Sequence, residues 1–106
     1  AQYHLHAHRA LELRPQTLLG LFQHLDVWRR PDRLEQFIAV CEADARGRLG
    51  FEEQPYPQAA YLRGAYRAAS EVDCAEIARQ VEQPDQIAQA IRRARLVAIK
   101  RFAAHY

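Results

Sequence analysis

The sequence has little of the residues that interrupt regular structure, and it lacks the long apolar runs of membrane proteins. Glycine occurs four times and proline five times among 106 residues, and hydrophobic residues make up 49% of the chain. These proportions exclude a disordered or fibrous protein and indicate one folded domain. No stretch approaches about 18 consecutive apolar residues and no signal-peptide pattern opens the chain, so we expect a cytoplasmic location and no membrane contact.

Cysteine is scarce, and acidic residues are missing from one end. The spacing of Cys41 and Cys74 suits neither a CxxC pair nor a disulfide framework, so we expect two free thiols. No acid follows Asp85, whereas the same end is crowded with cations. These cations are Arg92, Arg93, Arg95, Lys100 and Arg101. This end of the chain is therefore a candidate surface for a polyanion.

Apolar spacing and proline positions together predict an all-α fold. Apolar residues recur at three- and four-residue steps in every long segment, and none alternates with the period of two that a strand requires. Proline is tolerated in the first turn of a helix because its fixed φ and missing N–H do no harm there. Asp73 with Glu76 resembles a capping box at the start of a short helix. We expect helices over 15–29, 31–49, 57–72, 73–81 and 84–105, in a compact bundle of about five helices plus an N-terminal helical remnant.

Two acid–base pairs stand close together in the stretch CEADARGR, at 41–48. A step of about 100° per residue places Asp44 and Arg48 towards the core, and Glu42 and Arg46 on or near the solvent face. A partly buried ion pair costs several kcal/mol in desolvation unless it is well paired and hydrogen-bonded. Asp44 and Arg48 therefore form either an internal clamp between helices or a metal-facing carboxylate held by a guanidinium.

Histidines near the start of the chain form a second candidate site. His4 and His8 stand four residues apart and share a helix face, a geometry that can bind a metal ion. Surface or core histidines have the same spacing, so the residues alone leave both readings open.

Four stretches together resemble the carboxy-terminal part of the bacterial multifunctional CCA protein family, the tRNA nucleotidyltransferases that carry an HD phosphohydrolase domain. They are DVWRRPDR at 26–33, CEADARGR at 41–48, PYPQ at 55–58 and IAQAIRRARLVAIKRF at 87–102. The resemblance implies a parent that uses Mg²⁺, ATP and CTP in a head domain, and Mg²⁺, Mn²⁺ or Ni²⁺ in the HD domain. The head's glycine-rich loop with DxD and the adjacent His-Asp pair are absent, so we expect no catalytic residues, no bound metal and no activity in this fragment.

The resemblance also assigns roles to particular residues. His4 and His8 match family histidines, although Leu5 stands where some relatives carry an acid, and Asp44 lies where HD domains commonly place a late ligand. It implies that 1–50 end an HD-type domain and that 51–106 form a helical tail lying along tRNA. From the chain length we expect both parts to form one compact unit. The residues expected to contact RNA phosphates are Arg46, Arg92, Arg93, Arg95, Lys100 and Arg101. One alternative is a non-catalytic helical interaction module. The other is a metal phosphohydrolase that acts by itself, although the sequence offers fewer ligands than one metal ion needs.

Overall fold

The described part of the chain is built from helices and contains no strand. The computed structural model describes residues 8–47 and 56–106, apart from the side chain of Arg46. Its α-helices are α2 (Pro15–Leu25), α3 (Asp32–Arg46), α4 (Pro57–Ser70), α5 (Cys74–Gln80) and α6 (Ile87–Ala104). Short 3-10 turns, η1 (Ala10–Glu12) and η2 (Pro84–Gln86), precede α2 and α6. The prediction of an all-α fold is confirmed.

Local signals set several helix ends. Pro15 and Pro57 are the first residues of α2 and α4, where their missing N–H groups leave no hydrogen bond unmade. Asp73 caps α5, because its Oδ1 accepts a hydrogen bond of 3.0 Å from the backbone N–H of Glu76. In a complete capping box, the Glu76 side chain would also accept a hydrogen bond from the backbone N–H of Asp73. Here the Glu76 carboxylate accepts hydrogen bonds from Arg79 and Gln80 instead.

Helix α2 ends four residues earlier than the apolar spacing predicts. Asp26 adopts a left-handed conformation with φ of 59°, which aspartate tolerates better than most residues. The backbone N–H of Val27 then donates to the carbonyl of Phe22 over 3.3 Å, closing the helix as in a Schellman motif. This turn brings Trp28 back to the core, where its ring stacks on Tyr66 with centroids 5.6 Å apart.

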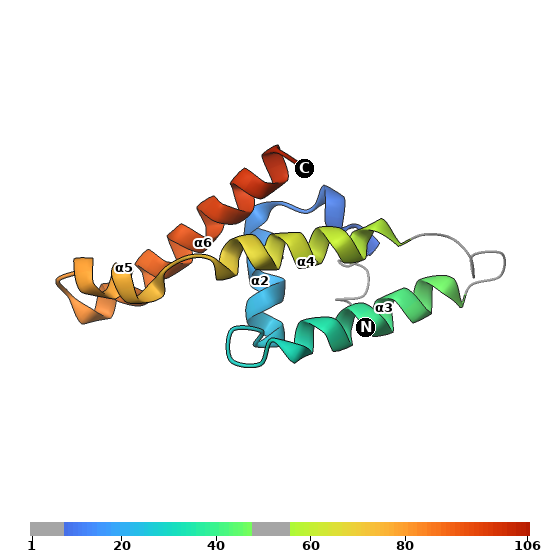
Figure 1. Ribbon diagram of the computed structural model, residues 1–106, viewed down its shortest axis with the longest axis horizontal. Helices are drawn as coiled ribbons and strands as arrows, with labels where there is room; N and C mark the ends of the chain where they lie inside the picture. The colour runs from blue at the N-terminus through green and yellow to red at the C-terminus, as the bar shows by residue number, and fades with distance from the viewer. Residues whose placement is uncertain (1–7, 48–55) are drawn as a thin grey trace.

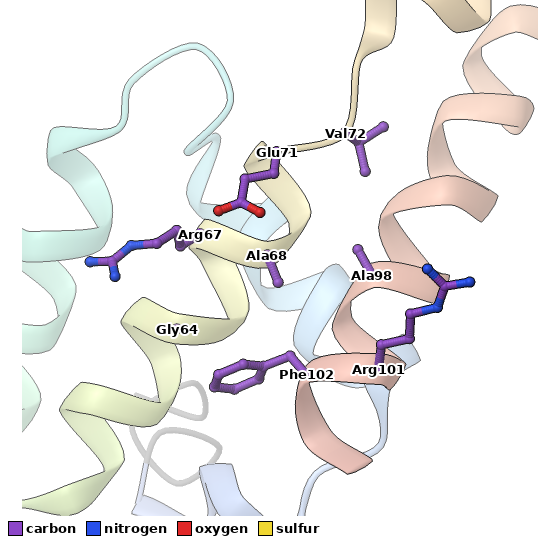
Figure 2. Close-up of a pocket in the computed structure, with 8 residues that line it drawn as sticks. All are labelled: Gly64, Arg67, Ala68, Glu71, Val72, Ala98, Arg101 and Phe102. Carbon is purple, nitrogen blue, oxygen red and sulfur yellow. The ribbon is translucent and has the colours of Figure 1, made fainter. Parts of the chain in front are cut away.

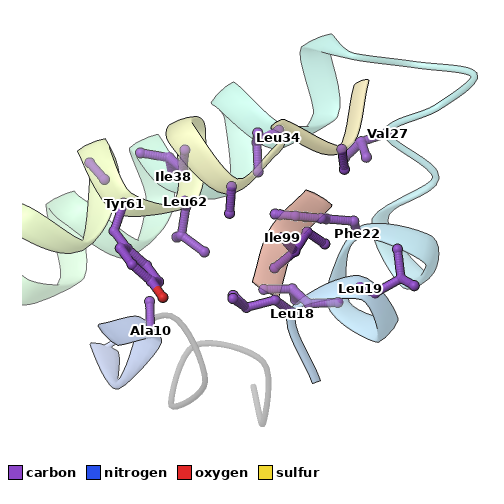
Figure 3. Close-up of a cluster of buried hydrophobic side chains, with 14 of the residues drawn as sticks. Ala10, Leu18, Leu19, Phe22, Val27, Leu34, Ile38, Tyr61, Leu62 and Ile99 are labelled. Atoms are coloured by element: carbon purple, nitrogen blue, oxygen red, sulfur yellow. The ribbon is translucent and has the colours of Figure 1, made fainter. Parts of the chain in front are cut away.

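Helix α6 packs along α4 and also contacts α2 and α5. Helix α3 packs against α2 and α4. Figure 1 shows α2 running steeply across the direction of α3 and α4, and α5 at the far end where the chain turns back into α6. The buried side chains come from both sides of residue 50 and form one cluster (Figure 3). The largest of them are Leu18, Leu19, Leu21, Phe22, Leu34, Ile38, Leu62 and Ile99. Among the described residues, no helix has the length and apolarity that a bilayer span requires.

The packed side of α6 is rotated from the stripe that its sequence predicts. Ile99 is fully buried, and Leu96, Phe102 and Ala103 pack partly against the core. The three- and four-residue spacing of apolar residues in this segment predicts an inward stripe of Ile87, Ile91, Ala94, Ala98 and Phe102, all of which are only partly buried. The physical reason is that α6 contacts two helices, α2 and α4, so its buried side faces the angle between them and not a single partner.

Candidate functional site

One side of α6 carries cations that have no partner within the described part of the chain. Arg93, Lys100 and Arg101 are exposed, and no hydrogen bond or ion pair joins their side chains to another described residue. With a step of about 100° per residue, these three fall within a sector of about 100° that also contains Val97. Val97 is 48% exposed, so this face of the helix is open to solvent. The arrangement is a narrow row of unpaired positive charge.

The two other cations predicted for this surface are engaged with the protein. Arg92 donates from Nη1 to the side-chain oxygen of Gln23 on α2, over 3.0 Å. The guanidinium carbon of Arg95 lies 3.9 Å from the centre of the Trp28 ring, and Nη2 donates to the Cys74 sulfur over 3.5 Å. Arg95 therefore packs between helices, and the prediction that it contacts RNA stays a prediction. The side chain of Arg46, also predicted to bind RNA, lies outside the described residues.

A second polar constellation surrounds His8, where η1 meets the end of α3 and the start of α4. His8 Nε2 lies 3.0 Å from Asp44 Oδ2, and Nδ1 lies 3.0 Å from the Tyr56 hydroxyl. The side-chain amide of Gln58 donates to the His8 carbonyl over 2.9 Å. The His8 side chain is 18% exposed and that of Asp44 is 48% exposed. Residues far apart in sequence thus fix both nitrogens of one imidazole.

Burial controls the protonation of the groups beneath this constellation. Burial, with the nearby Cys41 and the Asp44 carboxylate, raises the pKa of Tyr56 to about 12, so its hydroxyl keeps its proton at neutral pH. Burial and Asp44 likewise raise the pKa of the Cys41 thiol to about 11. In one neutral tautomer, His8 Nδ1 accepts a hydrogen bond from the Tyr56 hydroxyl and Nε2 donates to the Asp44 carboxylate. In the other tautomer, Nδ1 donates to the Tyr56 oxygen and the lone pair of Nε2 is available to a metal ion.

Several known proteins similar to this chain are multifunctional CCA proteins. The chain is 54% identical over 101 residues to the multifunctional CCA protein of Pseudomonas aeruginosa, with 95% of this chain covered. It is 50% identical over 101 residues to the multifunctional CCA protein of Hahella chejuensis, again over 95% of this chain. The chain belongs to the multifunctional CCA protein family.

The match to the multifunctional CCA proteins concerns their C-terminal portion. The chain spans 25% of the Pseudomonas aeruginosa protein and 24% of the Hahella chejuensis protein. No family model and no solved structure matches the chain. The family assignment therefore rests on these relatives, and the resemblance seen in the sequence is confirmed.

Within this C-terminal portion of a multifunctional CCA protein, the structure brings together two of the three predicted metal residues. His8 and Asp44 face each other, and an imidazole nitrogen with a carboxylate oxygen suits a divalent transition metal. The Tyr56 hydroxyl on the other ring nitrogen is the kind of partner that orients a ligating histidine. His4 lies outside the described residues, and no group of three or more potential ligands occurs among those that are described.

The expected inward position of Asp44 is not observed. Its side chain is 48% exposed because it lies near the end of α3 and reaches across to His8. Arg48, its expected clamp partner, lies outside the described residues, so that pairing stays a prediction.

Sequence reasoning missed two participants, Tyr56 and Gln58. Their roles depend on contacts with His8 that span 48 and 50 residues of sequence, which no local pattern encodes. The available signal was the PYPQ stretch at 55–58, which carried part of the family resemblance.

Proposed function

We propose that this chain is the C-terminal, tRNA-holding part of a CCA-adding tRNA nucleotidyltransferase. The parent protein would add cytidine and adenosine from CTP and ATP to the 3′ end of tRNA in the cytoplasm, with Mg²⁺ bound by a head domain that this sequence does not contain. Residues 1–50 would end an HD-type domain, and 51–106 would form a tail that shares its core. The chain itself would supply no catalytic residue to nucleotide transfer.

The observation that carries the RNA-holding role is the row of unpaired cations on α6. Arg93, Lys100 and Arg101 extend over about two turns and face solvent. Cations near a helix C-terminus also complement the helix dipole, but that effect falls off within the last turn and does not account for Arg93. A row of guanidinium and ammonium groups matches a phosphate backbone, and neutralising phosphates releases counterions. Such contact does not depend on base identity.

Binding of fluorescently labelled tRNA to the chain tests this role. We expect measurable affinity at about 50 mM salt and a steep loss towards 200 mM, as for other proteins that neutralise several phosphates. Similar affinity for tRNAs of different sequence is expected, because the contacts are to the backbone. A chain that shows no tRNA binding at low salt would instead favour the helical interaction module.

A second candidate function is a divalent metal site at His8 and Asp44. The observation that favours it is the 3.0 Å separation of Nε2 and Oδ2, with the opposite ring nitrogen already held by Tyr56. A bound metal would supply Lewis-acid chemistry for phosphate ester hydrolysis in the parent. Two described ligands are too few for hydrolysis by this chain alone.

Thermal unfolding in the presence of Mg²⁺, Mn²⁺ or Ni²⁺ tests the metal site. A ligand that binds only the folded state raises the melting temperature, and we expect this rise in the wild type but not in Asp44→Ala. An equal rise in both proteins would remove Asp44 from the ligand set.

A further inference from the structure

A groove runs between α4 and α6 on the side away from the buried core. Its volume is about 560 Å³, and its walls come from the second half of each helix. The helices approach closely here because Gly64, Ala68 and Ala98 have small side chains, and the Phe102 ring fills the space over Gly64 (Figure 2). Phe102 is only partly buried, so part of its ring faces the groove.

Charged side chains of both signs line the rim of this groove. Figure 2 shows Arg67 of α4 and Arg101 of α6 extending to opposite sides, with the carboxylate of Glu71 between them on the α4 side. No hydrogen bond or ion pair joins these three charged groups to another described residue. Two cations and one carboxylate without a described partner therefore stand on the rim above an apolar floor.

We propose that this groove binds one unstacked nucleotide of the RNA, with a base that carries an exocyclic amino group. The base lies against Phe102 and the small residues, and its amino group donates to Glu71. The phosphates on either side of it reach Arg67 and Arg101. This inference rests on the proposed RNA-binding function and names one subsite of the RNA-binding surface. The α6 cations would bind the RNA backbone next to this subsite.

Each part of the groove matches one part of this ligand. Proteins that read single-stranded RNA stack splayed bases on aromatic side chains and hydrogen-bond their exposed edges. A carboxylate accepts from the N4 amino group of cytosine, whereas the O4 carbonyl of uracil at the same position offers it no hydrogen. A phosphate alone does not fit the groove, because Glu71 repels it and the floor offers no polar group. Together these features favour a nucleotide over a free anion.

Short single-stranded oligonucleotides test the subsite. Oligo(C) and oligo(U) of equal length carry the same number of phosphates and pyrimidine rings, so a difference in their affinity reports on the base edge. We expect the chain to bind oligo(C) more tightly than oligo(U) by about fivefold or more, which corresponds to one good contact to a base edge. Glu71→Gln should remove that preference, because the uncharged amide can accept from the amino group of cytosine through its oxygen or donate to the O4 carbonyl of uracil through its nitrogen.

Matched variants separate the subsite from general charge effects. Glu82→Gln removes the same charge from another exposed carboxylate and should leave the preference for oligo(C) intact. Ala98→Leu fills the groove and should weaken binding of both oligonucleotides, provided that its melting curve shows a folded protein. Glu71 is exposed, so the Glu71→Gln result does not depend on whether Ala98→Leu folds.

The possible failures of the subsite and of the RNA-holding role differ. Equal affinity for oligo(C) and oligo(U), with tRNA binding that still depends on the α6 cations, would overturn the subsite and leave the RNA-holding role standing. Loss of the oligo(C) preference in Glu82→Gln as well as in Glu71→Gln would also overturn it. Absence of any RNA binding by the wild type would overturn both.

Discussion

The guanidinium carbon of Arg95 lies 3.9 Å from the centre of the Trp28 ring, which in turn stacks on Tyr66. A cation over an indole face contributes about 0.5–2 kcal/mol, and the arginine stem adds apolar packing. We therefore expect Arg95→Ala to lower the free energy of unfolding by about 1–2 kcal/mol. Arg93→Ala, at an exposed position on the same helix, should change it by less than about 0.5 kcal/mol.

Fluorescence reports on the same contact, because Trp28 is the only tryptophan in the chain. We expect the emission maximum of Arg95→Ala to move to longer wavelength as water reaches the ring. An unchanged spectrum together with unchanged stability would contradict the packing role of Arg95 and leave its side chain available for RNA contact.

Replacing either of two glycines in helix interiors by alanine should change the free energy of unfolding, but in opposite directions. A Cβ at Gly64 would clash with the Phe102 ring, and that ring is held by Tyr61 and Tyr106 with centroids 5.3 and 5.4 Å away. We expect Gly64→Ala to cost about 1–2 kcal/mol, because overpacking outweighs the helix propensity of alanine. Gly20→Ala meets no atom within 4 Å and should stabilise the protein by about 0.5–1 kcal/mol. Urea unfolding of the two variants measures both signs, and stabilisation by Gly64→Ala would show that Phe102 does not pack as described.

The ion pair between α3 and α4 should make stability depend on pH. Arg63 donates to both carboxylate oxygens of Glu35, with a shortest distance of 2.8 Å, and this hydrogen bond lowers the pKa of Glu35 although burial opposes it. A lowered pKa in the folded state means that the stabilisation is present above the unfolded pKa of about 4.3 and is lost as the pH falls through the folded value. Both side chains are about half exposed, so the pair contributes less than about 1 kcal/mol. Glu35→Gln should therefore be less stable than wild type at pH 7 and nearly equal to it at about pH 3. A deficit that persists unchanged at the lower pH would contradict the assignment to this ion pair.

The loss of stability expected from replacing Asp44 depends on how exposed its side chain is. A fully buried charge pair loses about 3–5 kcal/mol when one partner is deleted, but a half-exposed pair contributes about 1 kcal/mol or less. Since the Asp44 side chain is 48% exposed, we expect Asp44→Ala to cost about 1 kcal/mol. A double-mutant cycle with His8→Gln measures the coupling directly. A loss above about 3 kcal/mol would show that Asp44 has the buried role that its helical phase predicts.

Helix positions were predictable from the sequence because their signals are local. Proline at the starts of α2 and α4 and the Asp73 cap of α5 act within one turn of the chain. The early end of α2 was not predictable, because the apolar spacing continues to Trp28 while the left-handed Asp26 turns the chain. The rotation of α6 was missed for a related reason, since its buried side depends on the joint position of α2 and α4.

The candidate sites show the same division between local and long-range information. The sequence predicted a basic α6, but only the structure separates Arg93, Lys100 and Arg101, which face solvent, from Arg95, which covers Trp28. Residue spacing and the family resemblance both made His8 and Asp44 candidate metal residues. Their mutual contact spans 36 residues and required the packed helices.

The salt dependence of tRNA binding tests most directly whether α6 holds RNA through phosphates. The informative variant is Arg93→Ala, Lys100→Ala and Arg101→Ala combined, and a charge-matched control is Arg29→Ala, Arg30→Ala and Arg33→Ala combined, at exposed positions around the α2–α3 turn. We expect the slope of log affinity against log salt to become shallower by about 2–3 units in the α6 variant, because up to three phosphates lose their cations. The control should keep most of the wild-type slope. An unchanged slope in the α6 variant, or an equal loss in the control, would show that α6 does not hold RNA through phosphates.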